Sequence, residues 1–276
     1  FTGNVAIGFR AMNSTAGNAQ TGTIAIGQDS LTALTSGEKN VAIGYESGKA
    51  VSTGQRNTVL GYQAFLTSVD ADECVAIGNY AMAANATQDG TVAIGRSALA
   101  ALTSGVGATV VGYQAGDAIT GGDYNTAIGY QALSTEDTGD RNTAVGYGSL
   151  LNVNGANDNA NTALGYLSGT NISTGTKNVA IGADSGGVLA SGNYNTLIGH
   201  TTAPNASDGE NQIVIGYHAA GKGDNKVTIG NGDITDVYMA EDSGATVHCA
   251  QTVVTEGINF PDDASANPSG DVNTLD

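Results

Sequence analysis

Short apolar runs that end in glycine recur along most of the chain. The stretch NTAIGYQAL at residues 125–133 returns as NTAVGYGSL at residues 142–150, and as NVAIGYESG at residues 40–48. The glycine that ends each run, here called the marker glycine, recurs every 17 residues in most intervals, every 19 residues twice and after 14 residues once. Such constant spacing indicates that each repeat forms one turn of a solenoid. The marker glycines are Gly8, Gly27, Gly44, Gly61, Gly78, Gly95, Gly112, Gly129, Gly146, Gly165, Gly182, Gly199, Gly216 and Gly230.

Each position of the repeat, counted from the marker glycine, has its own residue type. The residue before the glycine is Ile, Val or Leu, the third residue before it is Val, Ile or Thr, and the residue between them is usually Ala. β-Branched residues favour strands because they pack well on a pleated surface. We therefore expect a strand of four or five residues in each repeat. The marker glycine permits the positive φ that the following corner needs.

The rest of each repeat is expected to return the chain to the start of the next strand. A second extended segment, such as YQAL or YESG, follows the marker glycine, and a pair such as Thr53-Gly54 is expected to turn the chain again. The sequence thus predicts an all-β fold, a parallel β-solenoid (β-roll) of about 14 coils over residues 1–230, with strands roughly 4.8 Å apart. Helical repeats are rejected because they are longer, at about 30 residues or more, and avoid Gly and β-branched runs.

Both faces of the predicted strand carry residues that favour burial. Thr or Val and Ile point to one face, and Ala points to the other. Strands buried on both faces require a second layer, which we expect to come from sister chains in a homotrimer. The alternative is a monomeric solenoid whose own second sheet covers the Ala face. The sequence does not decide which face meets a sister chain.

Two further repeat positions carry polar or aromatic side chains. Asn stands four residues before the marker glycine in eight repeats, and Tyr stands one residue after it in seven. The Asn side chains could form amide ladders along the rod, or could merely suit a turn before a strand. The Tyr side chains could stack as a stripe that packs at a seam or faces a ligand, and packing is the favoured interpretation.

Composition and charge narrow the classes of partner. The chain of 276 residues has 41 Gly, no Trp and four Phe, and its formal net charge is −17. Since its nine Lys and Arg residues are scattered, neither a nucleic-acid groove nor docking on an anionic membrane is expected. No stretch is apolar for long enough to predict membrane insertion. Cys74 and Cys249 are expected to be two unpaired thiols.

The NVAIG and NTAIG repeats resemble those in the YadA-like heads of trimeric autotransporter adhesins and in phage tail fibres built from the same repeats. The resemblance covers about residues 4–230. It implies a left-handed parallel β-roll in which three chains wrap around one axis. The repeat of the adhesin heads is usually a few residues shorter than the 17 residues found here.

The C-terminal part of the chain departs from the repeat after Gly230. Residues 231–260 are expected to form a short β-strand segment, with two strands around the EDSG turn. Residues 261–276 are polar and contain two Pro, which predicts a linker or a disordered end. The phrases DVYMAEDSGATVH and GINFP…NTLD resemble segments near the C-terminal part of phage tail fibres, and the chain could be a fragment of something longer.

Candidate catalytic and metal-binding residues are few. His200 and His218 lie in adjacent repeats but at different positions, so a metal site would need further ligands; His248 is the third histidine. Two acidic groups could in principle serve glycan cleavage, although solvated corners are the favoured interpretation. They are Asp70, Asp72 and Glu73, and Glu136, Asp137 and Asp140.

Three irregular stretches are further candidates. The GGD sequence at Gly121 to Asp123 faintly resembles calcium-binding β-rolls, but the nine-residue repeat of that class is absent. The two intervals of 19 residues place extra residues at Asn13 to Gly22 and at Asn152 to Asn161. Insertions in solenoids form loops that often bind ligands, although drift at an exposed corner is the favoured interpretation. No catalytic, cofactor or metal residue is assigned.

These observations predict a structural and adhesive protein rather than an enzyme. The expected function is the shaft of a homotrimeric phage tail fibre in the virion, presenting a region that binds a host-surface glycan or protein receptor. Alternatives are a bacterial surface adhesin head or an extracellular filament subunit of the same fold. A glycan-cleaving tailspike is the least favoured. Multivalency would raise avidity without strong single sites.

Overall fold

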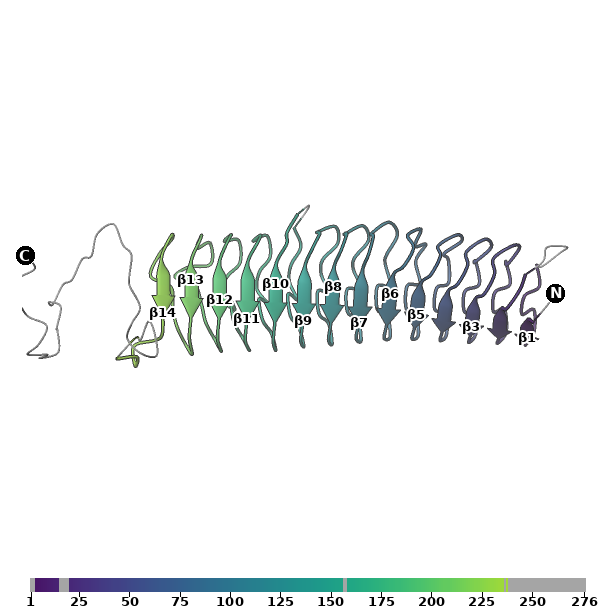
Figure 1. Cartoon of the computed structure of the whole chain (residues 1–276), viewed down its shortest axis with the longest axis horizontal. Coiled ribbons are helices and arrows are strands. Elements are labelled where there is room, and N and C mark those ends of the chain that lie inside the picture. Colours follow the sequence, from purple (N-terminus) through teal and green to yellow (C-terminus); the bar gives the residue numbers. More distant parts are fainter. Residues whose placement is uncertain (1–2, 15–19, 156–157, 236, 238–276) are drawn as a thin grey trace, which may run out of the picture. The chain divides into compact units, whose positions relative to one another are not determined.

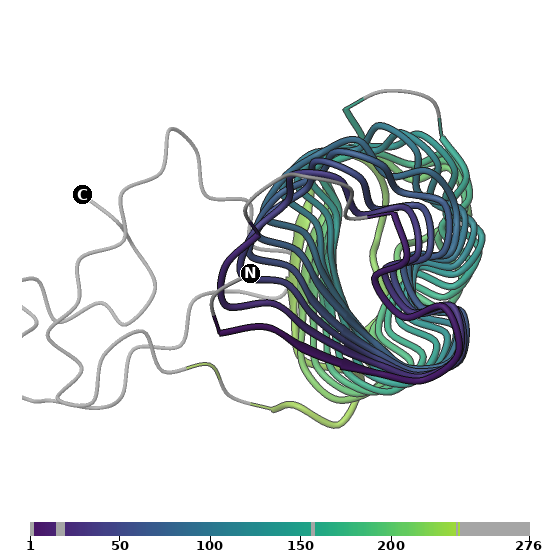
Figure 2. The same cartoon turned by 90° about the vertical axis from the view of Figure 1, so that its right-hand side faces the viewer.

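A computed structural model describes residues 3–14, 20–155, 158–235 and 237 of the chain. The chain divides into two units, Phe1–Ile234 and Thr235–Asp276. The first unit contains the repeats and is a stack of similar coils (Figure 1). Viewed along the stack, the coils follow one another around the same narrow outline (Figure 2).

Every coil contributes one short strand to a single parallel sheet. The 14-stranded sheet has its strands in sequence order, and each strand pairs in parallel with the next. Equivalent residues face each other, as in the pairing of Ala25 with Ala42 and of Ile26 with Ile43. The predicted all-β parallel solenoid with a 17-residue repeat is therefore confirmed. The strands are β1 (Val5–Ile7), β2 (Ile24–Ile26), β3 (Val41–Ile43), β4 (Thr58–Leu60), β5 (Val75–Ile77), β6 (Val92–Ile94), β7 (Thr109–Val111), β8 (Thr126–Ile128), β9 (Thr143–Val145), β10 (Thr162–Leu164), β11 (Val179–Ile181), β12 (Thr196–Ile198), β13 (Ile213–Ile215) and β14 (Val227–Ile229).

Each strand is shorter than the sequence predicted. All 14 contain three residues, where four or five were expected. The marker glycine ends the strand because it adopts a left-handed φ, for example +138° at Gly129. A Cβ at Gly129 would collide with the carbonyl oxygen of Gly146 in the next coil. Only glycine fits this corner, because successive corners stack backbone on backbone.

The second extended segment of each coil was also predicted wrongly. The residues after the marker glycine form consecutive turns, and positive φ recurs at the second and fourth residues beyond it. In one coil these residues are Gln63, with φ of 50°, and Phe65, with φ of 52°. The amide of Gln63 donates to the preceding coil, to the oxygen of Tyr45, and the amide of Phe65 donates to the next coil, to the oxygen of Ala81. The turns thus satisfy their backbone by bonding in both directions along the stack.

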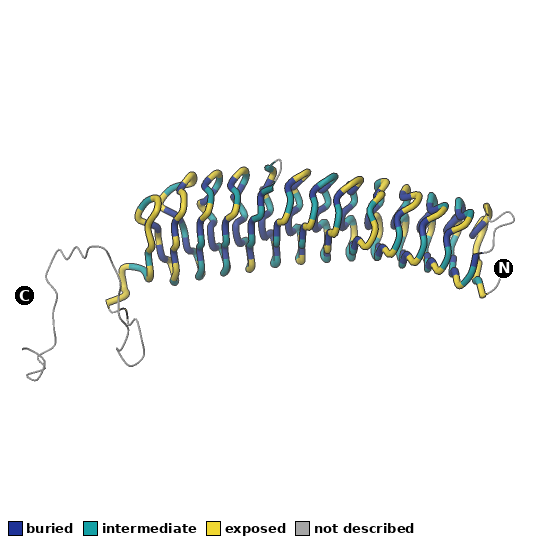
Figure 3. The backbone as a smooth tube through the Cα atoms, turned by 45° about the horizontal axis from the view of Figure 1, so that its top comes forward, coloured by how far each residue is buried: buried dark blue, intermediate teal, exposed yellow. Residues whose placement is uncertain are grey.

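The interior of the coil is formed by the Ala face of the sheet and the turns opposite it. Ala25, Ala42 and Ala127 are fully buried. Glycines leave room for the large side chains of neighbouring coils. For example, a Cβ on Gly48 would lie only 2.9 Å from Cδ2 of Leu31 in the preceding coil, which is too close for normal packing. The same chain therefore covers the Ala face, with turns rather than the second sheet of the alternative model. Buried and exposed positions recur in register from coil to coil (Figure 3).

The opposite face of the sheet is left partly open in the single chain. We call the first and last residue of each strand the outer face. These residues are Val, Ile, Leu or Thr in all 14 strands. Ile128 on this face is 39% exposed and Leu164 is 48% exposed, whereas their neighbours Ala127 and Ala163 are fully buried. In the described coils, the outer face is therefore the face of the sheet that another molecule can reach.

The C-terminal predictions fall largely outside the described residues. Residues 231–235 form a turn and irregular backbone rather than a strand. The two strands expected around the EDSG turn, and the linker at 261–276, lie beyond what the structure describes.

Candidate functional site

The asparagines before the strands form a buried hydrogen-bonded ladder. Asn57 Nδ2 donates to the carbonyl oxygen of Ala71 at 2.8 Å. Asn57 Oδ1 accepts from the backbone nitrogen of Cys74, one coil later, at 2.9 Å. Direct amide-to-amide bonds also occur, as from Asn195 Nδ2 to Asn178 Oδ1 at 3.0 Å. The predicted ladder is therefore present, and most of its bonds join a side chain to the backbone of the next coil.

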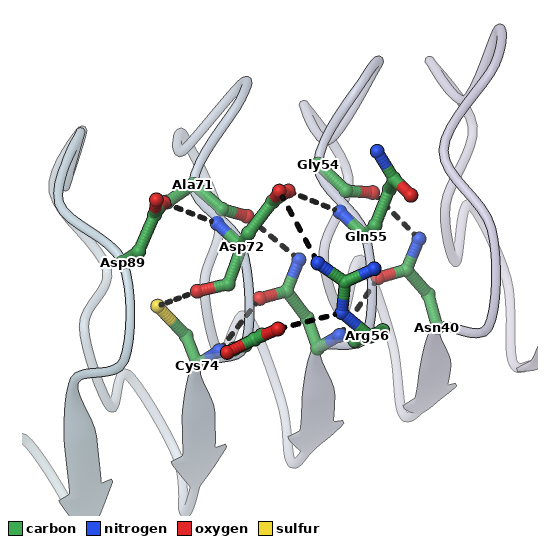
Figure 4. A network of polar contacts seen from close by, with 10 residues as sticks. Asn40, Gly54, Gln55, Arg56, Ala71, Asp72, Cys74 and Asp89 are labelled. Atoms are coloured by element: carbon green, nitrogen blue, oxygen red, sulfur yellow. Dashed lines mark hydrogen bonds and ion pairs between the residues drawn. The ribbon is translucent and has the colours of Figure 1, made fainter.

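A second ladder of carboxylates and amides runs along the adjacent corner, six residues before the marker glycine. Asp72 Oδ1 accepts from the backbone nitrogen of Gln55 at 2.7 Å, and Asp89 Oδ1 accepts from that of Asp72 at 2.7 Å (Figure 4). Here the side chain bonds to the preceding coil, the reverse of the asparagine ladder. Sequence reasoning missed this ladder. The signal was the recurrence of Asp or Asn at this position, as at Asp123, Asp140, Asn193 and Asp224.

The first acidic group is held by ion pairs and backbone bonds. Arg56 Nε lies 2.8 Å from Glu73 Oε1, and Arg56 Nη2 lies 3.9 Å from Asp72 Oδ2. Asp70 is exposed. Glycan hydrolysis needs two carboxyl groups facing each other across a sugar-binding cleft, one as acid and one as base or nucleophile. The geometry here instead links neighbouring coils at a corner.

In the second acidic group, the predicted solvated position is wrong for Glu136, which is fully buried, whereas Asp137 is exposed. The position of Glu136 belongs to the interior, where other coils place residues such as Leu102 and Ile119. Glu136 Oε1 accepts from the backbone nitrogens of Asp137 at 3.0 Å and Gly139 at 2.6 Å. Its Oε2 accepts from Asn159 Nδ2 at 2.9 Å. Burial raises the pKa of Glu136, and these bonds oppose the rise.

The bonding of Glu136 explains why a carboxylate is tolerated inside the coil. Asn159 belongs to the 19-residue interval, so Glu136 ties the enlarged coil to its predecessor. The other two carboxylates of the group serve separate bonds. Asp137 Oδ1 accepts from the hydroxyl of Thr120, and Asp140 Oδ1 accepts from the backbone nitrogen of Asp123 at 2.8 Å. Each of these contacts joins one coil to its neighbour.

The two described histidines lie together at one exposed edge. The imidazole centroids of His200 and His218 are 5.7 Å apart. Thr201 Oγ1 lies 3.2 Å from Nδ1 of His200 and 2.8 Å from Nδ1 of His218. This hydroxyl donates to the carbonyl oxygen of His200 at 2.8 Å. The Thr201 hydroxyl therefore bridges the Nδ1 atoms of the two histidines. His248 lies outside the described residues.

The structure describes the GGD stretch in full and the two 19-residue intervals in part. Asp123 of the GGD stretch accepts from the backbone nitrogen of Val106 at 2.9 Å, as a member of the carboxylate ladder. Residues 15–19 and 156–157 of the intervals lie outside the description. Near the second, Arg141 Nη1 lies 3.1 Å from Asp158 Oδ1. The described residues of these segments bond to neighbouring coils.

Cys74 is a buried free thiol at a position that Asn occupies in many coils. Burial raises the pKa of Cys74 to about 11, while backbone hydrogen bonds oppose the rise. Such a thiol is a poor nucleophile because the reactive species is the thiolate. Cys74 is unpaired, as expected. The prediction for Cys249 lies outside the described residues.

Tyrosines form stacks on the exposed edge beside the outer face. Tyr113, Tyr130, Tyr147 and Tyr166 follow the marker glycines of four successive coils. Neighbouring ring centroids are 5.1 to 5.3 Å apart, and the interplanar angles are 4° to 17°. We call these four residues the tyrosine stack. The stripe predicted from the sequence is thus present, and its rings pack on one another.

Comparison with other proteins does not identify a family for the chain. No protein-family model, no curated protein and no solved structure matches the chain. Within the described residues, no group of three or more His, Cys, Asp or Glu side chains is placed to hold a metal ion. The same residues contain no helix that is long and apolar enough to cross a membrane.

Proposed function

We propose that the chain is a structural and adhesive rod, the shaft of a homotrimeric phage tail fibre that presents a region binding a host-surface glycan or protein. The observation that carries this proposal is the outer face. No strand of the 14 places a charged residue on it, although the chain contains 26 Asp and Glu residues. Exclusion of charge from one continuous, partly exposed face is what association between copies requires.

The size of the outer face supports the same proposal. With 14 strands about 4.8 Å apart and three residues of about 3.3 Å each, the face measures about 65 Å by 10 Å. Its projected area of about 650 Å² approaches the roughly 800 Å² that each partner buries in a standard interface. A second copy of the chain, with the same face, is a matching partner.

Outside the outer face, the surface of the coils carries charged side chains. The corner beside the asparagine ladder carries charged side chains, among them Arg56, Asp72 and Glu73. With a net charge of −17, copies repel one another unless the uncharged faces meet. Charge and apolar surface together favour one mode of association, with the strands inside and the charged corners outside.

A rod of this kind acts mechanically. Strands β2 to β13 each pair with both neighbouring strands, and the turns and side-chain ladders add further bonds between coils. The stiffness holds any terminal binding regions of the copies together. Linked copies bind a repetitive surface with far higher avidity than a single copy does.

Antibody labelling tests the location. Antibodies raised against the purified chain are expected to label the tails of virions in electron micrographs, and to block adsorption of those virions to host cells. Labelling of bacterial surfaces without virions would support an adhesin head instead, and labelling along extracellular filaments would support a filament subunit. Either of these results would overturn the assignment to a phage.

A further inference from the structure

The tyrosine stack brings four phenol rings into a continuous column. Its three ring pairs have centroid distances of 5.2, 5.1 and 5.3 Å from Tyr113 to Tyr166. A shorter column exists at Tyr45 and Tyr62, with centroids 5.1 Å apart and an interplanar angle of 10°. These distances are within the range of offset-stacked aromatic pairs.

Stacking determines which parts of the rings are accessible. The faces of Tyr130 and Tyr147 are covered by their neighbours, yet these residues remain 43% and 48% exposed. The solvent therefore meets ring edges and hydroxyl groups. A sugar that needs an open aromatic face finds none on the two inner rings. A small oxidant, which takes an electron from the ring, and water, which takes the phenol proton, both reach the side chains.

We propose that the tyrosine stack is an oxidative modification site, at which a one-electron oxidant joins neighbouring rings in a carbon–carbon bond between coils. Each phenol loses an electron to the oxidant and a proton to water. The two phenoxyl radicals pair their electrons in a bond between ortho carbons. The ortho hydrogens then move to the phenol oxygens and restore both aromatic rings. With hydrogen peroxide and a haem peroxidase, two tyrosines and one peroxide give one dityrosine and two waters.

The fold supplies the proximity that this coupling needs. Both radicals must be present on adjacent rings, and the backbone bonds between coils hold those rings together throughout. One such bond joins the nitrogen of Gln131 to the oxygen of Tyr113 at 3.0 Å. Reaction within such a pair has an effective concentration far above that of free tyrosine. The ortho carbons still have to approach each other, which requires rotation of the side chains about their χ angles.

The other tyrosines of the described surface provide a built-in comparison. Tyr124 and Tyr194 are more exposed, at 60% and 56%, but neither belongs to a stack of tyrosines. Tyr194 instead has Lys177 Nζ 5.6 Å from its ring centroid. If exposure alone governed oxidation, these residues would couple at least as well as the stack. If stacking governs it, they contribute little.

A bond in the stack would act as a staple. It would link residues one repeat apart, such as Tyr130 and Tyr147, which are already joined through the sheet. A cross-link that closes a loop restricts the unfolded chain more than the folded one, and so favours the folded state. Oxidation in the extracellular environment would then harden the rod. The inference does not depend on the proposed assembly of copies.

The test compares two triple variants of the full chain. Y62F/Y130F/Y166F keeps aromatic rings in the stacks but leaves no two stacked phenols adjacent. Y124F/Y194F/Y217F removes the same number of phenols elsewhere. Dilute protein is treated with a haem peroxidase and hydrogen peroxide, and dityrosine is measured by its fluorescence and by mass spectrometry of linked peptides.

We expect the unmodified chain and Y124F/Y194F/Y217F to form dityrosine with equal yield, and Y62F/Y130F/Y166F to lose at least nine-tenths of it. The oxidised chain should run as a single chain under denaturing conditions, with two hydrogens lost per bond and a higher unfolding temperature. Equal yields in both variants, linked peptides from Tyr124 or Tyr194, products joining different chains, or no dityrosine would each overturn the proposal.

Discussion

The side-chain oxygen of Asn40 accepts a hydrogen bond from the backbone nitrogen of Asn57, one coil later, at 3.0 Å. Asn57 repeats the contact with Cys74 at 2.9 Å. Both asparagines are buried, so their amides must find protein partners. A buried Asn has a donor and an acceptor at the same point, which lets it bind two backbone groups of the next coil at once, as Asn57 does with Ala71 and Cys74. This dual role makes the Asn position a junction between coils.

Asn178 is the clearest position at which to test this junction. Its Nδ2 donates to Gly192 O at 2.8 Å, and its Oδ1 accepts from Asn195 N at 2.9 Å. Asn178→Asp replaces the donor by an acceptor facing a carbonyl oxygen. We expect a loss of about 3 kcal/mol or more in the free energy of unfolding at neutral pH, since a buried charge would lack a partner. Denaturant unfolding measures it. Asn85→Asp, at an exposed position, should change stability by less than about 0.5 kcal/mol; equal losses would contradict the ladder.

The marker glycines should be irreplaceable for two reasons that act together. Gly129 has φ of +138°, and a Cβ there would collide with the oxygen of Gly146. We expect Gly129→Ala to cost about 3–5 kcal/mol, combining backbone strain with overpacking. Gly90 provides the matched control because its φ is +68° and a Cβ would meet no atom within 4 Å. Gly90→Ala should cost about 1 kcal/mol, from strain alone. Thermal unfolding that ranks the two variants in reverse order would refute this explanation.

The turns opposite the sheet hold non-glycine residues in a left-handed conformation, and relieving it should stabilise the protein. Ser97 has φ of 56°, and one coil has glycine at the equivalent position, Gly148. The left-handed conformation costs Ser97 about 1–2 kcal/mol. Glycine avoids this strain, and its extra loss of conformational entropy on folding costs less, about 0.5–1 kcal/mol. Ser97→Gly is therefore expected to raise the free energy of unfolding by about 0.5 kcal/mol. Ser97→Val should lower it by more than about 1 kcal/mol, with Ser97→Ala as the control for the lost hydroxyl. A gain in stability with valine would show that φ does not limit this site.

The thiol of Cys74 should make stability fall in alkaline solution. Burial raises its pKa to about 11 from an ordinary value of 9.0. The folded state thus keeps a proton that the unfolded state loses, so the contribution is complete below pH 9 and is lost as the pH rises toward 11. In a Cys249→Ser background, denaturant unfolding should show this decline, and Cys74→Ala should remove it. Rapid labelling of Cys74 by a thiol reagent in the folded protein at neutral pH would contradict its burial.

The repeat could be predicted from the sequence because each column is chemically uniform. A glycine that must accept positive φ, a β-branched residue on one face and Ala on the other recur with a fixed spacing, and these three requirements define one coil. The Ala face and the outer face could not be assigned from the sequence. That assignment depends on how the chain folds back: the small side chain of Ala42 is buried, and the turn at Gly48 lies against it.

The errors have physical causes as well. A segment such as YQAL suggests a strand, but inter-coil hydrogen bonds stabilise left-handed residues such as Gln131, with φ of 51°, that propensity disfavours. Glu136 was predicted to be solvated because its acidic group lies where the repeat turns. Its burial depends on two backbone nitrogens and on Asn159, which is 23 residues away. The carboxylate ladder was missed because Asp at a turn usually signals only local capping.

The molar mass of the purified chain in solution, measured by light scattering, tests most directly the claim that copies associate through the outer face. A trimer would have about three times the 27.4 kDa of the chain. I43E/I128E/L164E, which places three carboxylates on the outer face, should reduce the mass to that of one chain while the circular dichroism of the coils is retained. The control V69E/V188E, at exposed apolar positions off that face, should remain trimeric. A stable fold with the mass of one chain, or a trimer that survives charges on the outer face, would contradict the account.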